Sequence, residues 1–172
     1  DYLNGELDIN DFLKFQLKIL GENDLNLLEE WRNVFFEVKI KPVILKKAYQ
    51  LVDDHRKQGH KLLIITATNR FIVEPIATEF KIENLIACEP ELNNQEFTGN
   101  FTGIPSYAEG KVLRFNDWLK HIDYQVEESW FYTDSHNDIP LMKEVNNPVA
   151  VDPDENLKNE AIKMNWPIIS LR

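Results

Sequence analysis

Leu62-Leu63-Ile64-Ile65-Thr66 is the stretch of sequence that decides the fold. Four consecutive aliphatic residues between polar neighbours are typical of a short strand that is buried on both faces. Sheets with two buried faces are mostly parallel, because the helices that connect parallel strands cover both faces. We therefore expect helices on either side of this strand in the sequence.

Apolar runs and helical patterns alternate after this strand. Further strands are predicted at residues 85–88, 130–132, 149–151 and 167–169, and helices at residues 71–80, 109–121, 139–145 and 155–164. A small hairpin that turns at Gly99-Asn100 is predicted over residues 97–103. Strands that alternate with helices indicate βαβ units. The predicted fold class is α/β, with a mostly parallel sheet and flanking helices.

The residues before the strand are predicted to be helical. Asp8 and Asp24 suit the N-caps of two helices, and Pro42 suits the first turn of a third helix that ends at Gly59. Large apolar and aromatic residues form a stripe on the second helix, and we expect them to pack in a core. The sequence thus predicts a helical lobe in front of an α/β body.

Composition excludes several classes of protein. The 172 residues carry 19 Lys and Arg against 29 Asp and Glu, a formal net charge of −10, and 43% are hydrophobic, which excludes a disordered chain. Binding to a nucleic acid is not expected, because phosphates need a basic surface and this chain is acidic. Insertion into a membrane is not expected either, because no apolar run approaches the roughly 20 residues of a membrane helix. The single cysteine, Cys88, excludes an intrachain disulfide framework and fits a reducing, cytoplasmic location.

Polar residues follow three of the predicted strands directly. They are residues 66–70 (TATNR), 133–138 (TDSHND) and 152–154 (DPD). In open parallel sheets, ligands bind beyond the carboxyl ends of the strands. We therefore expect a binding site where these segments meet.

Residue types in these segments suit phosphate chemistry, although each residue also has a simpler explanation. Asp134 and Asp138 suit Mg²⁺, which binds through one or two carboxylates, waters and phosphate, but Asp138 also suits a helix cap. Lys111 can neutralise a phosphate and equally suits an exposed surface. His136 suits proton transfer and equally suits a polar loop. Thr66 can donate to a phosphate oxygen, and threonine is common in strands.

Taken in order, three segments resemble motifs II, III and IV of the haloacid dehalogenase superfamily. They are residues 64–71 (IITATNRF), 109–111 (EGK) and 132–138 (YTDSHND). The resemblance is closest to the phosphoserine-phosphatase-like branch, and within it to bacterial histidinol-phosphatase-like hydrolases. It implies a Rossmann-like core over residues 42–172 and part of a helical cap over residues 1–41.

The resemblance also implies an activity, a cofactor and site residues. The activity is hydrolysis of a small phosphorylated metabolite, such as phosphoserine or histidinol phosphate, through an aspartyl-phosphate intermediate, with Mg²⁺ as cofactor. Thr66 would hold a phosphoryl oxygen, Lys111 would stabilise the nucleophile and the phosphate, and Asp138 would order Lys111 and support the metal shell. The remaining implied residues are Asp134 as metal ligand and Thr68, Asn69 and Arg70 as substrate contacts.

The chain departs from the family pattern in one respect. Motif I, an Asp-x-Asp-x-Thr-like stretch after the first strand, supplies the nucleophile and the acid in the family, and the 172 residues contain no match to it. Asp152-Pro153-Asp154 follows a late strand and is not assigned as the nucleophile. We expect a preceding segment with motif I and the first, central strand of the sheet, and no turnover by the 172-residue chain alone.

Two other interpretations remain open from the sequence. The first is a non-catalytic fragment or a phosphate-ligand-binding α/β domain, which the missing motif I favours. The second is a receiver-like or flavodoxin-like domain, against which the helical lobe and the position of Lys111 argue. The sequence specifies no oligomeric state.

Overall fold

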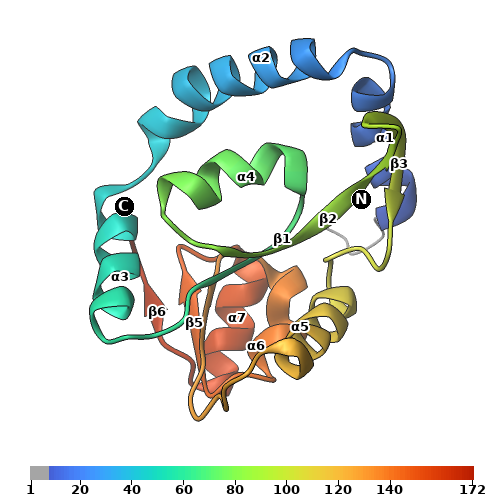
Figure 1. Cartoon of the computed structure of the whole chain (residues 1–172). Coiled ribbons are helices and arrows are strands. Elements are labelled where there is room, and N and C mark those ends of the chain that lie inside the picture. The colour runs from blue at the N-terminus through green and yellow to red at the C-terminus, as the bar shows by residue number, and fades with distance from the viewer. Residues whose placement is uncertain (1–7) are drawn as a thin grey trace. The chain divides into compact units, whose positions relative to one another are not determined.

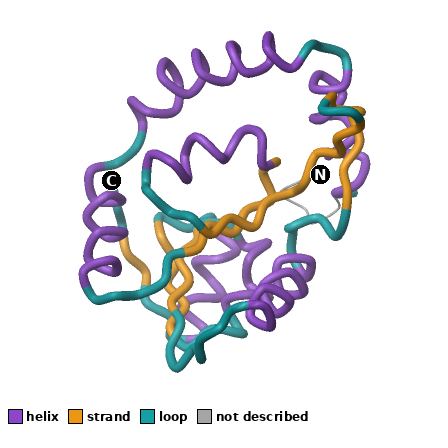
Figure 2. The backbone as a smooth tube through the Cα atoms, in the orientation of Figure 1, coloured by secondary structure: helices purple, strands orange, loops and turns teal. Residues whose placement is uncertain are grey.

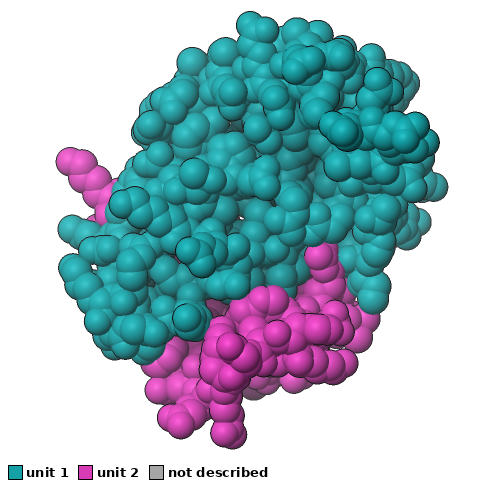
Figure 3. All heavy atoms as spheres, viewed as in Figure 1, with its two compact units in different colours: residues 1–44, 48–106 teal, residues 45–47, 107–172 magenta. Residues whose placement is uncertain are grey.

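The structure is a computed structural model that describes residues 8–172. Figure 1 labels the helices and strands of the chain, and the described residues form two compact units (Figure 3). Of the described residues, the first unit contains residues 8–44 and 48–106, and the second contains residues 45–47 and 107–172.

The first unit begins with two capped helices, α1 (Ile9–Gly21) and α2 (Leu25–Phe35). The Asp8 carboxylate accepts hydrogen bonds from two backbone N–H groups of α1, and Asp24 accepts one from α2, so both predicted caps are confirmed. The chain then continues through the π-helical turn η2 (Phe36–Ile40) and the 3₁₀ turn η3 (Lys41–Val43) into α3 (Lys46–Lys57).

The apolar stripe of α2 lies largely in solvent, so its prediction as core is wrong. Leu28 and Phe36 are buried, whereas Trp31 and Phe35 are 46% and 44% exposed. The row of residues that faces the body contains Leu28, Arg32 and Phe36, at spacings of four. Two neighbouring rows of this helix are both rich in apolar residues, and hydrophobic periodicity alone does not distinguish them.

A three-stranded sheet forms the body of the first unit, in the order β1-β2-β3 (Figure 2). β1 (Leu63–Asn69) pairs in parallel with β2 (Asn84–Asn93), and the helix α4 (Arg70–Glu79) connects them. β2 pairs antiparallel with β3 (Glu96–Thr102). The buried core of this unit joins α1, α2, α4 and β2 and includes Leu13, Leu17, Leu20, Leu28, Phe71 and Cys88.

The predicted hairpin at Gly99-Asn100 is wrong, because both residues lie within the single strand β3. The chain turns instead at Asn94 and Gln95, whose φ angles of 51° and 69° have the signs of a tight hairpin turn. Within β3, Gly99 has a φ angle of 82°, and α1 packs against β3 at this point. A Cβ atom on Gly21 would lie 2.6 Å from the backbone nitrogen of Gly99, so only glycine permits this approach.

The second unit contains a parallel sheet in the order β4-β5-β6, with helices α5 (Glu109–His121) and α7 (Glu155–Met164). The strands are β4 (Trp130–Thr133), β5 (Asn147–Val151) and β6 (Ile168–Ile169). Two short helical turns, η4 (His136–Asp138) and α6 (Ile139–Met142), follow β4. Met142, Ala150, Leu157 and Ala161 form the buried core of this unit.

The predicted α/β class is confirmed, since every strand pair except β2–β3 is parallel. The division into a cap over residues 1–41 and a core over residues 42–172 stays a prediction. Across the residues that the structure describes, no helix is both long and apolar enough to cross a membrane.

Candidate active site

A buried ion pair lies at the centre of the second unit. The Lys111 Nζ atom is 2.6 Å from Asp138 Oδ1, and both residues are 6% exposed. The Thr133 hydroxyl donates a hydrogen bond to the other carboxylate oxygen, Asp138 Oδ2, at 2.6 Å. A buried ion pair adds little stability compared with apolar side chains of the same size, so stability alone does not account for this pair.

These contacts show which of the two explanations from the sequence applies to Asp138 and to Lys111. Asp138 precedes α6, but its side chain makes no capping hydrogen bond there. Both of its oxygens are instead bound by Lys111 and Thr133, so Asp138 is not simply a helix cap. Lys111 is buried and paired, so it is not a solvated surface lysine.

A strained backbone positions Lys111. Ala108, the N-cap residue of α5, has φ 45° and ψ −123°, a conformation that alanine rarely adopts. The next turn is held by backbone hydrogen bonds from Gly110 to Tyr107 and from Lys111 to Ala108. Strain of this kind costs about 1–3 kcal/mol and is concentrated at functional sites.

The Asp134 carboxylate is exposed and makes no hydrogen bond or ion pair within residues 8–172. In the same part of the chain, no group of three His, Cys, Asp or Glu side chains is arranged to hold a metal ion. Uncommitted carboxylate oxygens fit Mg²⁺, which takes few protein ligands and completes its shell with water and phosphate. The residues present therefore fit Mg²⁺ with Asp134 as a protein ligand.

The loop that carries Asp134 is ordered by hydrogen bonds at several points. Ser135 caps η4 through its hydroxyl, which accepts from the N–H of Asn137 at 3.3 Å, and its own N–H donates to Thr133 Oγ1 at 3.2 Å. The Tyr107 hydroxyl donates to Asn137 Oδ1 at 2.9 Å. The loop is thus tied to the segment that leads into α5.

The Asp-x-Asp sequence at residues 152–154 has both carboxylates engaged. Asp152 accepts a hydrogen bond from the backbone N–H of Leu171, and Asp154 accepts from Leu157 and His136. Burial on its own raises the pKa of Asp154, but the backbone N–H groups of Leu157 and His136 and the His136 ring lower it on balance. These structural contacts support our decision not to assign the sequence as a nucleophile.

The other predicted site residues lie in the first unit. Thr66 is on β1, and its Oγ1 atom accepts a hydrogen bond from the N–H of Thr68 at 3.1 Å. Thr68 is exposed, whereas Asn69 is buried and caps α4 by accepting from the N–H of Ile72.

Arg70 is engaged within the first unit as well. Its guanidinium donates to both carboxylate oxygens of Glu89, at 2.7 and 2.9 Å, and to the Leu85 carbonyl at 2.9 Å. The hydrogen bonds to Glu89 raise the pKa of Arg70 further. Any contact of Arg70 with substrate would therefore be made by a guanidinium already held in place.

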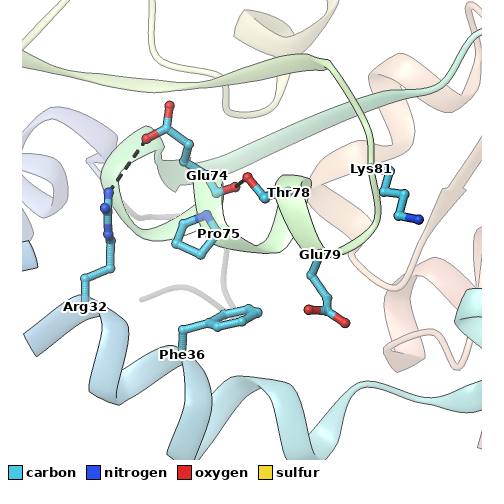
Figure 4. A pocket seen from close by; sticks show the side chains of 7 residues that line it. All are labelled: Arg32, Phe36, Glu74, Pro75, Thr78, Glu79 and Lys81. Carbon is cyan, nitrogen blue, oxygen red and sulfur yellow. Dashed lines mark hydrogen bonds and ion pairs between the residues drawn. The ribbon is translucent and has the colours of Figure 1, made fainter. Parts of the chain in front are cut away.

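A separate cavity of about 610 Å³ lies in the first unit (Figure 4). Arg32 borders it, with an ion pair to Glu74 at 3.6 Å and its guanidinium 4.5 Å from the ring centre of Phe71. The cavity is lined by Arg32, Phe36, Glu74, Pro75, Thr78, Glu79 and Lys81. None of the predicted site residues lines it, and we assign it no role.

Comparison with known proteins decides the family. Residues 2–143 match the family model of haloacid dehalogenase-like hydrolases. The chain belongs to the haloacid dehalogenase-like hydrolase family. This confirms the resemblance of the three motifs and the expectation of a hydrolytic enzyme.

Individual relatives of this haloacid dehalogenase-like hydrolase agree with the assignment. A protein of Neisseria meningitidis named "Histidinol-phosphatase" is 39% identical over 176 residues, which cover 100% of this chain and 79% of the relative. A solved structure from Bordetella pertussis, described as a protein with unknown function, is 36% identical and has a TM-score of 0.94. The match covers 99% of this chain and 78% of the Bordetella chain. A solved structure described as a phospho-aspartyl intermediate analogue of phosphoserine phosphatase has a TM-score of 0.69 at 15% identity. The match covers 99% of this chain and 76% of the phosphatase chain, and it shows that the two share a fold.

Three residues with contacts around the candidate site had no individual role assigned from the sequence. Thr133 directly precedes Asp134 at the end of a predicted strand, which was a usable signal for a role beside the aspartates. Asp154 was noted only as part of the segment 152–154, and its position before a predicted helix indicates no contact with another loop. Tyr107 gave no signal, because its partner Asn137 lies 30 residues away.

Proposed function

We propose that the protein is a Mg²⁺-dependent phosphatase that hydrolyses a small phosphomonoester through an aspartyl-phosphate intermediate. The buried Lys111–Asp138 pair, together with the uncommitted Asp134 carboxylate in the same loop as Asp138, carries this proposal. The names of the relatives support phosphatase activity, since the Neisseria relative is called a histidinol-phosphatase and a 24% identical Lactococcus lactis relative a phosphoserine phosphatase.

Each residue has a defined part in this proposal. Lys111 Nζ has three donors, and its contact with Asp138 leaves donors for a phosphoryl oxygen or an attacking carboxylate. Asp138 fixes the Nζ atom, and Thr133 fixes Asp138. Thr66 Oγ1 accepts from Thr68, so its own hydroxyl proton remains to be donated to a phosphoryl oxygen.

Asp134 would hold the metal ion, which supplies positive charge that neutralises and aligns the phosphoryl group. In the first step a carboxylate oxygen forms a bond to phosphorus while the bond to the leaving oxygen breaks, and a second carboxylic acid protonates that oxygen. Water then attacks the acyl phosphate, which releases phosphate and restores the carboxylate. We assign neither of these two carboxyl groups to a residue among 8–172.

Histidinol phosphate is the first substrate to test, because the Neisseria relative is the more similar of the two named phosphatases. Phosphoserine is the second. We propose Thr68, Asn69 and Arg70 as substrate contacts and, from the single buried Cys88, a reducing cytoplasmic location.

The test uses the protein produced from its natural reading frame, with its intact mass measured. Phosphate release from histidinol phosphate, phosphoserine and a generic aryl phosphate is followed with Mg²⁺ and with chelator. Asp134→Asn should lose at least about 99% of activity, and Asp117→Asn, an exposed aspartate of α5, should be unchanged. Full activity of Asp134→Asn at ordinary Mg²⁺ would refute the metal assignment.

Calorimetry on the same protein, beside the phosphate-release assay, tests the non-catalytic alternative. The absence of an assigned nucleophile among residues 8–172 favours that alternative. Calorimetric binding of phosphate and Mg²⁺ without release of phosphate from any ester would support a binding domain and contradict a phosphatase.

A further inference from the structure

Asp154 connects two loops of the second unit. Its backbone N–H donates to the carbonyl of Asp134 at 2.9 Å. Its Oδ2 atom accepts from the backbone N–H of His136 at 2.8 Å and lies 2.9 Å from the ring Nδ1 of the same residue. Its Oδ1 atom accepts from the N–H of Leu157 at 2.8 Å and so caps α7.

These contacts exceed what a helix cap needs. Asp8, Asp24 and Asn69 also cap helices, and their capping side chains accept from N–H groups of their own helix. Asp154 uses one oxygen in this way, whereas its other oxygen holds a loop that follows a different strand. The second set of bonds therefore requires an explanation beyond the stability of α7.

The bonds fix the backbone on both sides of Ser135. The carbonyl of Asp134 and the N–H of His136 are both held by Asp154, so the peptide units that flank Ser135 have little freedom to rotate. The first of these units, which joins Asp134 to Ser135, is one of the two peptide units that set the direction of the Asp134 side chain. The side chains of His136 and Asp154 are 15% and 29% exposed, so the contact is partly buried.

Asp154 is itself held firmly. Asp152 has a φ angle of 43°, and its N–H donates to the carbonyl of Ile169 while its carboxylate accepts from Leu171. The loop at residues 152–154 is thus anchored on the C-terminal segment of the chain. A fixed support of this kind suits the orientation of a neighbouring ligand.

We propose that Asp154 and His136 are positioning residues that hold the Asp134 carboxylate in the direction needed to bind a divalent metal ion. The proposal rests on the proposed function of Asp134. Neither residue touches the metal or the substrate in this proposal, and both act through the backbone of the loop at residues 134–138.

Substitutions separate this role from helix capping. Asp154→Asn keeps an oxygen for the N–H of Leu157 but replaces the acceptor for His136 with an NH₂ group. His136→Asn keeps a donor at the place of Nδ1, whereas His136→Ala removes it. Asp24→Asn is the matched control, since it makes the same change of charge at a cap that holds only its own helix.

Two measurements test the proposal on the protein from its natural reading frame. Mn²⁺ binding is followed by electron paramagnetic resonance, with Asp134→Asn as reference. Asp154→Asn and His136→Ala should raise the Kd for Mn²⁺ about 10- to 100-fold, the usual effect of losing a partner of a metal ligand. His136→Asn and Asp24→Asn should bind Mn²⁺ as the unchanged protein does.

Amide hydrogen exchange without metal gives the second readout. Peptides over residues 134–138 should exchange faster in Asp154→Asn and His136→Ala and at the original rate in Asp24→Asn. If Asp154→Asn does not fold, His136→Ala carries both tests.

The outcomes distinguish the two proposals. Unchanged Mn²⁺ affinity in Asp154→Asn and His136→Ala, with affinity lost in Asp134→Asn, overturns the positioning role and leaves the metal site. Unchanged exchange in the loop also overturns the positioning role. Mn²⁺ affinity that survives Asp134→Asn overturns the proposed metal site and the positioning role that depends on it.

Discussion

The Lys111–Asp138 pair allows a quantitative prediction. At the 2.6 Å separation of Nζ and Oδ1, an effective dielectric constant of about 20 gives an attraction of roughly 6 kcal/mol. Part of this offsets the cost of removing both charges from water, and removal of one partner from a buried pair costs about 3–5 kcal/mol. Because both side chains are 8% exposed, solvent screening reduces this figure little.

A double-mutant cycle measures the interaction. Lys111→Met and Asp138→Asn should each lower the free energy of unfolding by about 3–5 kcal/mol, because each leaves one buried charge unpaired. The double variant should be more stable than either single variant, since it removes both charges. Urea unfolding followed by tryptophan fluorescence gives the four values, and all three variants should lack phosphatase activity.

The exposed pair of Lys18 and Glu22 is the control for this cycle. Its atoms are 3.6 Å apart and its side chains are 70% and 59% exposed. Lys18→Met and Glu22→Gln should couple by no more than about 0.5 kcal/mol. A coupling energy this small for Lys111 and Asp138 would refute the burial argument, and a stable, active double variant would refute the functional role of the pair.

Three further results are expected. Gly21→Ala should lower the free energy of unfolding by about 1–3 kcal/mol, since its Cβ would lie 2.6 Å from the Gly99 nitrogen; a urea midpoint like that of the unchanged protein would contradict this packing. The Ser170 hydroxyl is the main cause that lowers the pKa of Asp152, so this carboxylate stabilises the fold above its unfolded pKa of about 3.9, and the stabilisation is lost as the pH falls through the lower folded value. The stability difference from Asp152→Asn should therefore be present at pH 7 and disappear in acid, and a pH-independent difference would argue against it. Thr66→Val should lose phosphate release while Thr66→Ser retains much of it, because only serine keeps the donor; equal kcat/KM values would remove Thr66 from the site.

Sequence patterns predicted the bounds of two helices correctly, and for one of them, α7, local chemistry explains both ends. The helix α5 (Glu109–His121) was predicted with the bounds that the structure has, and so was α7 (Glu155–Met164). Asp154 supplies a cap for α7, and Asn165 ends it with a left-handed φ of 55°. The hairpin prediction failed because Gly99-Asn100 has the composition of a turn, whereas Gly99 lies within β3 with a φ angle of 82°, a backbone conformation that favours glycine.

The site was predictable as a set of segments but not as a set of contacts. The rule that ligands bind at the carboxyl ends of strands selected the loop after β4, and it selected Asp134 and Asp138. That Lys111 meets Asp138 depends on how α5 packs, across 27 positions of sequence, and only the resemblance of the motifs suggested it. The contact between Asp154 and His136 joins loops after two different strands, and local patterns carry no signal for it.

The two aspartates of the loop show why residue type alone does not assign a role. Asp134 and Asp138 are four positions apart, and a sequence argument treats both as candidate oxygens for Mg²⁺. The structure gives them different surroundings, since Asp138 is buried with its oxygens bound to Lys111 and Thr133, whereas Asp134 is exposed with its oxygens uncommitted. Each oxygen of Asp138 already has a partner in a buried place, so Asp138 fits the support of Lys111 better than a solvent-facing metal ligand. The same chemical group therefore fits a metal ligand at one position, as we propose for Asp134, and supports a cation at the other, and burial and hydrogen-bond partners make the difference.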